Sequence, residues 1–187
     1  MAIPKAAYDS QLASAIASYK AQGVDIANVD KLALIKKEVL VGLVNNELVD
    51  QGIAASGIET NLADIEKQFQ LLVTQAGGAE GLKAQLVNSN ITEAQLRENI
   101  ARQLTVQAYI SQNVDMKSIS ASDAEVKTFY DNYSKQQKAS GVKTVPTLKS
   151  LTSEIKQQLV LNKQQELVAS FLTALQSKAK IVVPQPL

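Results

Sequence analysis

The chain of 187 residues contains no cysteine, no histidine and no tryptophan. Without cysteine it can form no disulfide and use no thiol chemistry. Without histidine it lacks the side chain most often used for acid–base catalysis and a common ligand of zinc. The absence of cysteine assigns no compartment, although it is compatible with an oxidising one. We therefore expect no catalytic residues, no metal site and no cofactor.

Glycine, proline and aromatic residues are also scarce, with eight glycines, four prolines and an aromatic content of 4%. Alanine, leucine, glutamine and lysine are abundant instead, and this composition favours helices. It predicts an all-α, mainly helical fold. A chain of this length can form one sizeable core, or one core with an appendage.

Charge and hydrophobicity argue against two classes of partner. The net charge is only +1, and arginine occurs only at Arg97 and Arg102, so there is no concentrated basic patch for nucleic acid. No apolar run approaches the roughly 20 residues that a membrane span needs. The first residues, MAIPKAAYDSQL, contain no signal-peptide core, so we expect an exported protein to be present here in its mature form.

Apolar periodicity and turn residues predict seven helices. In the third, Leu62, Ile65 and Phe69 recur at helical spacing, and the Gly77-Gly78 pair ends the helix. The seven expected helices span residues 6–22, 28–57, 61–76, 79–89, 90–110, 122–137 and 147–180.

Capping chemistry marks two of these helix starts, and a short break in the helices follows the second. Thr92 with Gln95, and Ser122 with Glu125, have the spacing of a capping box. After the second of these helices comes a short polar stretch, 135–146, and then a long last helix. The tail at 181–184 predicts a very short edge strand, with residues 2–4 as its only candidate partner.

Three segments follow one another in an informative order: ELVDQGIAASGIETNLADIEKQF, GGAEGLKAQLVNSNITEAQLRENIARQLTVQAYI and ISASDAEVKTFYDNY. The turn that ends a helix falls at 57–58, and helix starts fall at 90–97 and 123–130. Together they resemble the N-terminal domain of the SurA/PrsA/PpiD-type periplasmic foldases. The segment SEIKQQLVLNKQQELVASFLTALQSKAKIVV is similar to the closing helix and strand of that family.

The resemblance also indicates what is missing. Most members carry a parvulin-type prolyl isomerase domain before the closing helix, and parvulin sites generally rely on histidine. Here only residues 135–146 occupy that place, and the Val-Asn-Gly turn that usually opens the family is absent. We therefore expect an N-terminal helical chaperone core at 1–134, a short linker at 135–146, and a C-terminal helix and strand at 147–187 that complete the same core.

As such a module the chain is expected to be an ATP-independent chaperone without isomerase activity, located in the periplasm or otherwise outside the cytoplasm. It would bind unfolded, outer-membrane-type polypeptides through apolar groove surface. The alternative is that the same apolar residues pack against neighbouring helices or a second subunit. The expected peptide-binding residues are Val41, Val44, Phe69, Leu72, Tyr109, Phe129, Tyr130, Val160, Leu161, Leu167 and Phe171.

Other functions have weaker support in the sequence. The acid pairs Glu47/Asp50 and Asp123/Glu125 are explained by positions near helix surfaces or first turns. No helix face combines a dense lysine row with large aromatics, as a membrane-surface helix would. A non-catalytic adaptor that binds one folded partner remains the main alternative. The short connection also permits a homodimer that exchanges the C-terminal helix.

Overall fold

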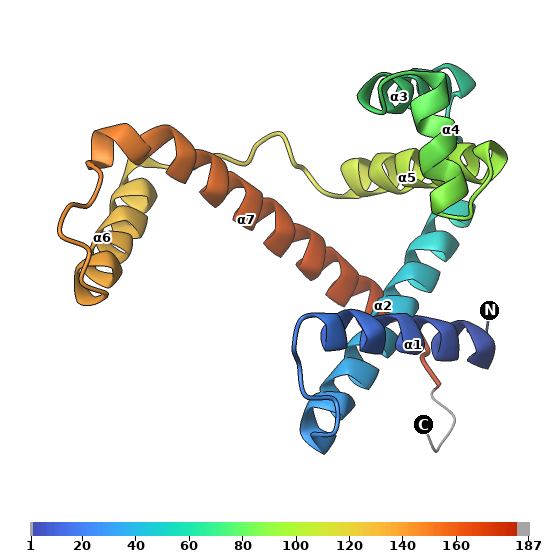
Figure 1. Cartoon of the computed structure of the whole chain (residues 1–187), viewed down its shortest axis with the longest axis horizontal. Coiled ribbons are helices and arrows are strands. Elements are labelled where there is room, and N and C mark those ends of the chain that lie inside the picture. Colours follow the sequence, from blue (N-terminus) through green and yellow to red (C-terminus); the bar gives the residue numbers. More distant parts are fainter. Residues whose placement is uncertain (1, 183–187) are drawn as a thin grey trace. The chain divides into compact units, whose positions relative to one another are not determined.

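The computed structural model describes residues 2–182, and within that range all regular secondary structure is helical (Figure 1). The expected all-α fold is confirmed. Its helices are α1 (Lys5–Ala21), α2 (Val29–Ser56), α3 (Leu62–Gln75), α4 (Ala79–Asn88), α5 (Glu93–Asn113), α6 (Asp123–Ala139) and α7 (Leu148–Lys178). No helix in the described range is both long and apolar enough to cross a lipid bilayer.

The expected pair of terminal strands is absent from the described residues. Residues 2–4, 181 and 182 form no strand, while Val183 and Pro184 lie outside the described range. Pro4 explains the N-terminal part of this difference. Its carbonyl accepts hydrogen bonds from the backbone N–H groups of Ala7 and Tyr8, so it already belongs to the start of α1.

Four helices end in the same hydrogen-bonded turn, the Schellman motif. At the end of α6, the N–H of Val142 donates to the carbonyl of Gln137 at 3.0 Å, and the N–H of Gly141 donates to that of Lys138 at 3.1 Å. The turn needs a left-handed residue just after the cap, which glycine adopts without steric cost. The four residues that fill this place are Gly23, Gly77, Asn90 and Gly141.

The helix starts follow the expected capping chemistry. In α6, Ser122 accepts from the N–H of Glu125, whose carboxylate accepts from the N–H of Ser122 at 2.8 Å, so the predicted capping box is confirmed. The same reciprocal bonds join Thr92 and Gln95. Such caps satisfy N–H groups that have no partner within the helix.

The break after α6 is a defined loop. Because α6 continues to Ala139, the first residues of the expected linker, 135–139, are helical. The Schellman turn at Gly141 then stops the helix, and the hydroxyl of Tyr130 donates to the carbonyl of Pro146 at 2.9 Å. Thr147 caps the next helix, since its Oγ1 accepts from the N–H of Ser150. Residues 140–147 are therefore tied to the helices at both ends.

Contacts divide the helices into two units, which we call unit 1 (residues 2–109 with 174–182) and unit 2 (residues 110–173). Helix α7 begins in unit 2, and its last residues, from Ala174, belong to unit 1. The division made from the sequence (1–134, 135–146 and 147–187) follows the break in the helices. The contacts instead group α6 with most of α7.

Unit 1 has its main interior where α3, α4 and α5 meet. Phe69, Leu82 and Ile100 form a buried cluster there, one residue from each helix. Partly buried hydrophobic residues surround it: Ile65, Leu72, Val73, Ala76, Leu86, Leu96 and Leu104.

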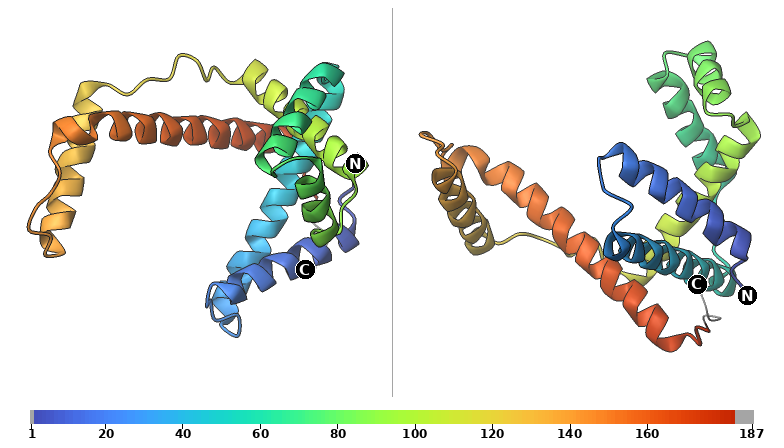
Figure 2. Two further views of the ribbon diagram at one scale, coloured as in Figure 1. Left: turned by 45° about the horizontal axis from the view of Figure 1, so that its top comes forward. Right: turned by 60° about the horizontal axis from the view of Figure 1, so that its bottom comes forward.

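Helix α2 joins this cluster to α1. The views in Figures 1 and 2 show α1 lying against α2, where the hydroxyl of Tyr19 donates to Glu38 at 2.8 Å. Further along α2, Asp50 forms an ion pair with Arg102 of α5 at 2.9 Å. The last residues of α7 also contact α2, because Gln176 donates a hydrogen bond to Asn45.

Unit 2 has a smaller interior, and ion pairs support it. Its buried side chains in the described range are Val114, Val126 and Ile155. At the start of α6, Asp123 pairs with Lys156 at 2.8 Å and Glu125 pairs with Lys163 at 2.7 Å. Both lysines belong to α7, so these pairs hold the first turn of α6 against α7.

Candidate functional site

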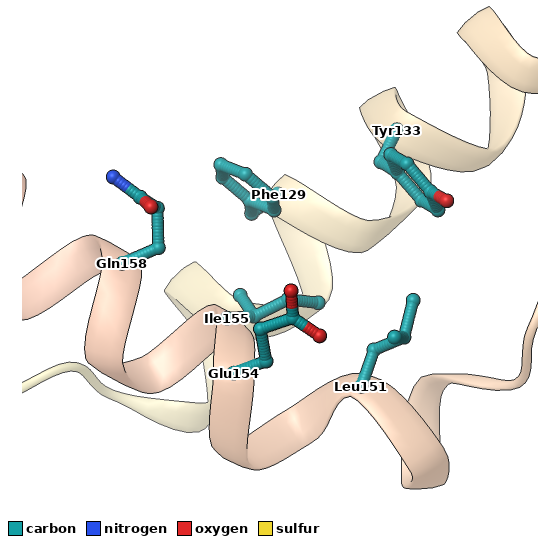
Figure 3. A pocket seen from close by; sticks show the side chains of 6 residues that line it. All are labelled: Phe129, Tyr133, Leu151, Glu154, Ile155 and Gln158. Atoms are coloured by element: carbon teal, nitrogen blue, oxygen red, sulfur yellow. The ribbon is translucent and has the colours of Figure 1, made fainter.

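Unit 2 contains a small recess between α6 and the first turns of α7 (Figure 3). Its volume is about 170 Å³. Figure 3 shows two aromatic rings from α6 facing side chains that project from α7. The six lining residues are Phe129, Tyr133, Leu151, Glu154, Ile155 and Gln158.

Helical spacing explains why these residues share the recess. Phe129 and Tyr133 are four residues apart on α6, so both rings lie on one face. Leu151 and Ile155 are likewise four apart on α7, and Glu154 and Gln158 repeat the spacing beside them. Helix α6 therefore contributes a row of aromatic side chains, and α7 contributes a row of aliphatic and polar side chains.

The polar groups of the recess are not equally engaged. The side-chain amide of Gln158 donates to Asn162 at 2.8 Å. Glu154 has no ion-pair partner within residues 2–182. Its neighbour Lys156 is paired with Asp123 instead. The recess thus presents a carboxylate without a cation beside two aromatic rings.

Unit 1 has a second, larger recess of about 380 Å³. It lies between α3, α4 and the segment that begins α5, alongside the core cluster of that unit. Its walls are mainly apolar and its polar groups are neutral. The lining residues are Leu72, Gln75, Ala76, Leu82, Gln85, Leu86, Ser89, Ile91 and Leu96.

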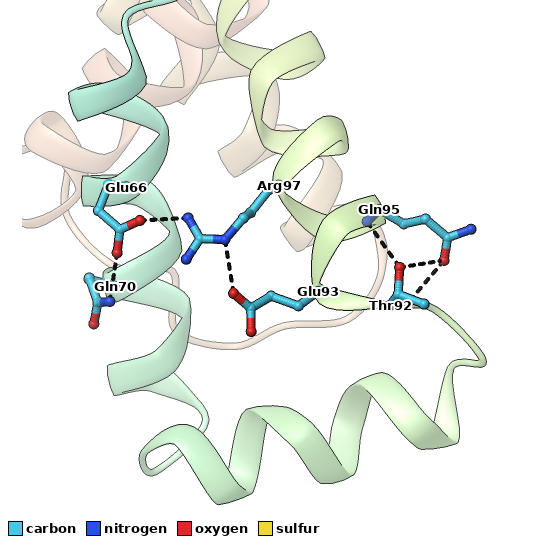
Figure 4. A network of polar contacts seen from close by, with 6 residues as sticks. All are labelled: Glu66, Gln70, Thr92, Glu93, Gln95 and Arg97. Atoms are coloured by element: carbon cyan, nitrogen blue, oxygen red, sulfur yellow. Dashed lines mark hydrogen bonds and ion pairs between the residues drawn. The ribbon is translucent and has the colours of Figure 1, made fainter.

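A charged network covers one side of the same core (Figure 4). The guanidinium of Arg97 lies 3.8 Å from the centroid of the Phe69 ring, a cation–π contact. Arg97 also pairs with Glu93 at 2.9 Å and with Glu66. The hydrogen bond from Arg97, with a smaller contribution from Gln70, lowers the pKa of Glu66 below its ordinary value. The Arg97 guanidinium therefore covers one face of the Phe69 ring.

The sequence-predicted site residues fall in both units, so they do not form one site within either. Leu72 lines the recess of unit 1 and Phe129 that of unit 2. Val41, Leu161 and Leu167 are exposed, whereas Val44, Val160 and Phe171 are half-buried.

Three aromatic residues of the expected set have structural roles in the chain. Phe69 and Tyr109 are buried, with only 6% of each exposed, so a ligand could reach them only by displacing core packing. The ring of Tyr109 lies directly against Gly52 of α2. Tyr130 is half-buried and its hydroxyl bonds to the loop at Pro146.

Several recess residues were absent from the prediction. The expected peptide-binding residues did not include Tyr133, Leu151, Glu154, Ile155 or Gln158. The repeated spacing of four on α6 and α7 was the available signal. It shows which residues share a face of one helix, but not which face of another helix they meet.

The acidic pairs are held separately by other side chains. Glu47 accepts from Gln51 at 2.8 Å, and Asp50 pairs with Arg102. Asp123 and Glu125 each pair with a lysine of α7. Within residues 2–182 no three acidic side chains come together in an arrangement that would hold a metal ion.

Comparison with known proteins found no relative. No protein-family model matches the chain, and neither a curated protein nor a solved structure is similar to it.

Proposed function

We propose that the protein is an ATP-independent chaperone that binds unfolded or extended polypeptides, including outer-membrane-type clients, through its apolar recesses. It would act in the periplasm or otherwise outside the cytoplasm, and would neither isomerise prolyl bonds nor use a cofactor. The ordered resemblance to the SurA/PrsA/PpiD-type foldases supports this assignment. The observation that carries the proposal is the pair of recesses with mainly apolar walls, one in each unit.

The size and lining of the recesses suit weak and promiscuous binding. The recess of unit 1 combines six apolar residues with Gln75, Gln85 and Ser89, whose polar groups can bond to an extended backbone. Burial of apolar client surface supplies the free energy of binding, at about 25 cal/mol per Å². The cost of ordering a flexible client offsets part of this gain, so we expect weak affinities, in the micromolar range.

Exposed aliphatic residues add contact area outside the recesses. Leu161, with 52% of its surface exposed, and Leu167 are both on α7 within unit 2. Single exposed apolar residues are common on folded proteins, so they have less weight than the recesses. They would lengthen the contact with an unfolded segment that already occupies a recess.

The test is breadth of client binding. We expect the protein to suppress aggregation of several unrelated denatured proteins, among them an outer-membrane-type β-barrel protein, at micromolar concentration and without ATP. Replacing Phe129 and Leu151 together with alanine should weaken suppression several-fold, because both line one recess. Val29→Ala is the matched control, since Val29 is exposed and lines neither recess.

Two results would contradict the proposal. Failure to suppress aggregation of any unfolded protein, together with capture of one folded partner, would support the adaptor instead. Isomerisation of a Xaa-Pro peptide above background would show that the chain has the catalytic activity that we propose it lacks.

A further inference from the structure

We infer that the recess of unit 2 binds an arginine side chain of the client polypeptide. This inference rests on the proposed function. It specifies which kind of client side chain one of the two recesses described above would bind. The recess is lined by Phe129, Tyr133, Leu151, Glu154, Ile155 and Gln158.

The volume of the recess fits one long side chain. At about 170 Å³ it is smaller than the range of about 300–1,000 Å³ typical of sites for whole small molecules. It opens between α6 and α7, so an extended chain can lie across it and insert a single residue. The aliphatic walls formed by Leu151 and Ile155 would contact the methylene stem of that residue.

The charge of the recess selects a cation. Glu154 is the only ionised residue among the six that line it, and it has no ion-pair partner within residues 2–182. On α7, Lys156 and Lys163 are paired with Asp123 and Glu125, and Lys149 forms no ion pair with Glu154 or with any other acid in the described range. An incoming aromatic or aliphatic side chain would cover the Glu154 carboxylate without pairing it, which costs free energy.

The aromatic rings favour arginine over lysine. A guanidinium is planar and less strongly hydrated than an ammonium, so it can stack on Phe129 or Tyr133 while it donates two hydrogen bonds to one carboxylate. Lysine presents a compact, strongly hydrated charge and would gain less from the rings.

The chain binds one of its own arginines by the same chemistry. Within unit 1, Arg97 stacks on the ring of Phe69. Its guanidinium also pairs with Glu66 and Glu93 (Figure 4). The unit 2 recess offers the equivalent groups, an aromatic ring and a carboxylate, without the guanidinium. The two sites differ in that the cation of unit 1 is supplied by the chain itself.

Matched peptides test the inference directly. Two fluorescent peptides of identical apolar sequence would carry either one arginine or one citrulline, which has nearly the same shape and no charge. Anisotropy titrations with the full chain should give about five- to tenfold tighter binding of the arginine peptide. A lysine peptide should fall between the two.

Two variants with the same change of charge locate the effect. Glu154→Gln should remove the preference for arginine, so that both peptides bind with the affinity of the citrulline peptide. Glu166→Gln is the matched control, because Glu166 is exposed on α7 and lies outside the recess. It should keep the full preference.

The remaining outcomes separate the two proposals. Equal binding of the arginine and citrulline peptides by a protein that still suppresses aggregation overturns the arginine inference alone. Absence of binding by both peptides, together with absence of suppression, overturns the chaperone as well. If Glu154→Gln instead converts a dimer into a monomer in sedimentation, the recess is filled by a second copy of the chain and the inference is wrong.

Discussion

Gly52 and Gly42 of α2 have opposite surroundings, although both are helical glycines. A methyl group added at Gly52 would collide with the hydroxyl and ring of Tyr109, which is buried. A methyl group added at Gly42 would meet no atom within 4 Å. Gly52 therefore has a packing role that composition alone does not reveal.

This contrast gives a matched pair of substitutions. Gly52→Ala should lower the free energy of unfolding by about 1–3 kcal/mol, because the buried Tyr109 ring must move. Gly42→Ala should raise it by about 0.5–1 kcal/mol, because alanine favours the helix and the site is open. Urea unfolding followed by circular dichroism measures both, and equal effects of the two changes would contradict the packing that we describe.

Local signals in single residues predicted most of the helix boundaries. Ser122 with Glu125 at a start and Gly77 at an end act through bonds to neighbours a few residues away, so the sequence alone is enough to find them. The strand prediction for Ile181 and Val182 used the same kind of local preference. Ile181 and Val182 form no strand, and in the candidate partner the carbonyl of Pro4 accepts hydrogen bonds from the first turn of α1.

At the level of elements, two ion pairs link the first turn of α6 to α7. The hydrogen bond from Lys163, followed in importance by those from the backbone and hydroxyl of Ser122, lowers the pKa of Glu125 from 4.5 to about 2. The same lysine donates to the carbonyl of Ser120 at 2.8 Å. Lys163 thus connects α7 to the segment before α6 and to its capping box.

The pKa of Glu125 is a direct probe of this connection. Replacing Lys163 with methionine should raise the pKa, although it should stay below the ordinary value because the bonds from Ser122 remain. Carbon-detected NMR titration of the side-chain carboxyl measures the change. Lys149→Met is the control, because Lys149 is also on α7 and has no ion pair in the described range.

The sign of the pH effect follows from the lowered pKa. The folded state binds the Glu125 proton more weakly than the unfolded state, so the bonds that Lys163 and Ser122 make to this carboxylate stabilise unit 2 fully above about pH 4.5. That contribution is lost as the pH falls from there through about 2. A Glu125 pKa that does not respond to Lys163→Met would mean that the α6–α7 ion pair does not form in solution.

Packing between elements also decided which site residues could be predicted. Phe129 was selected from the sequence, but its recess partners Leu151 and Glu154 lie on the next helix, beyond a loop. Phe69 was also among the expected peptide-binding residues, yet it is a core residue. Periodicity identifies a face, whereas only tertiary structure tells whether that face is covered.

For the whole molecule, helix α7 is the element that both units share. It contributes Leu151 and Glu154 to the recess of unit 2, and its last residues belong to unit 1. A homodimer that exchanges the C-terminal part of α7 stays a prediction. Each unit has its own recess, so the proposed chaperone activity requires no such exchange.

The central claim is that an unfolded chain lies in these recesses, and site-specific photocrosslinking tests it most directly. Benzoylphenylalanine would replace Tyr133 or Leu86, one from each recess, or Ser14 as an exposed control on α1. We predict that a denatured β-barrel client crosslinks at positions 133 and 86, and that the same client in its folded state does not. Crosslinking of equal yield at position 14, or none at either recess, would contradict the account.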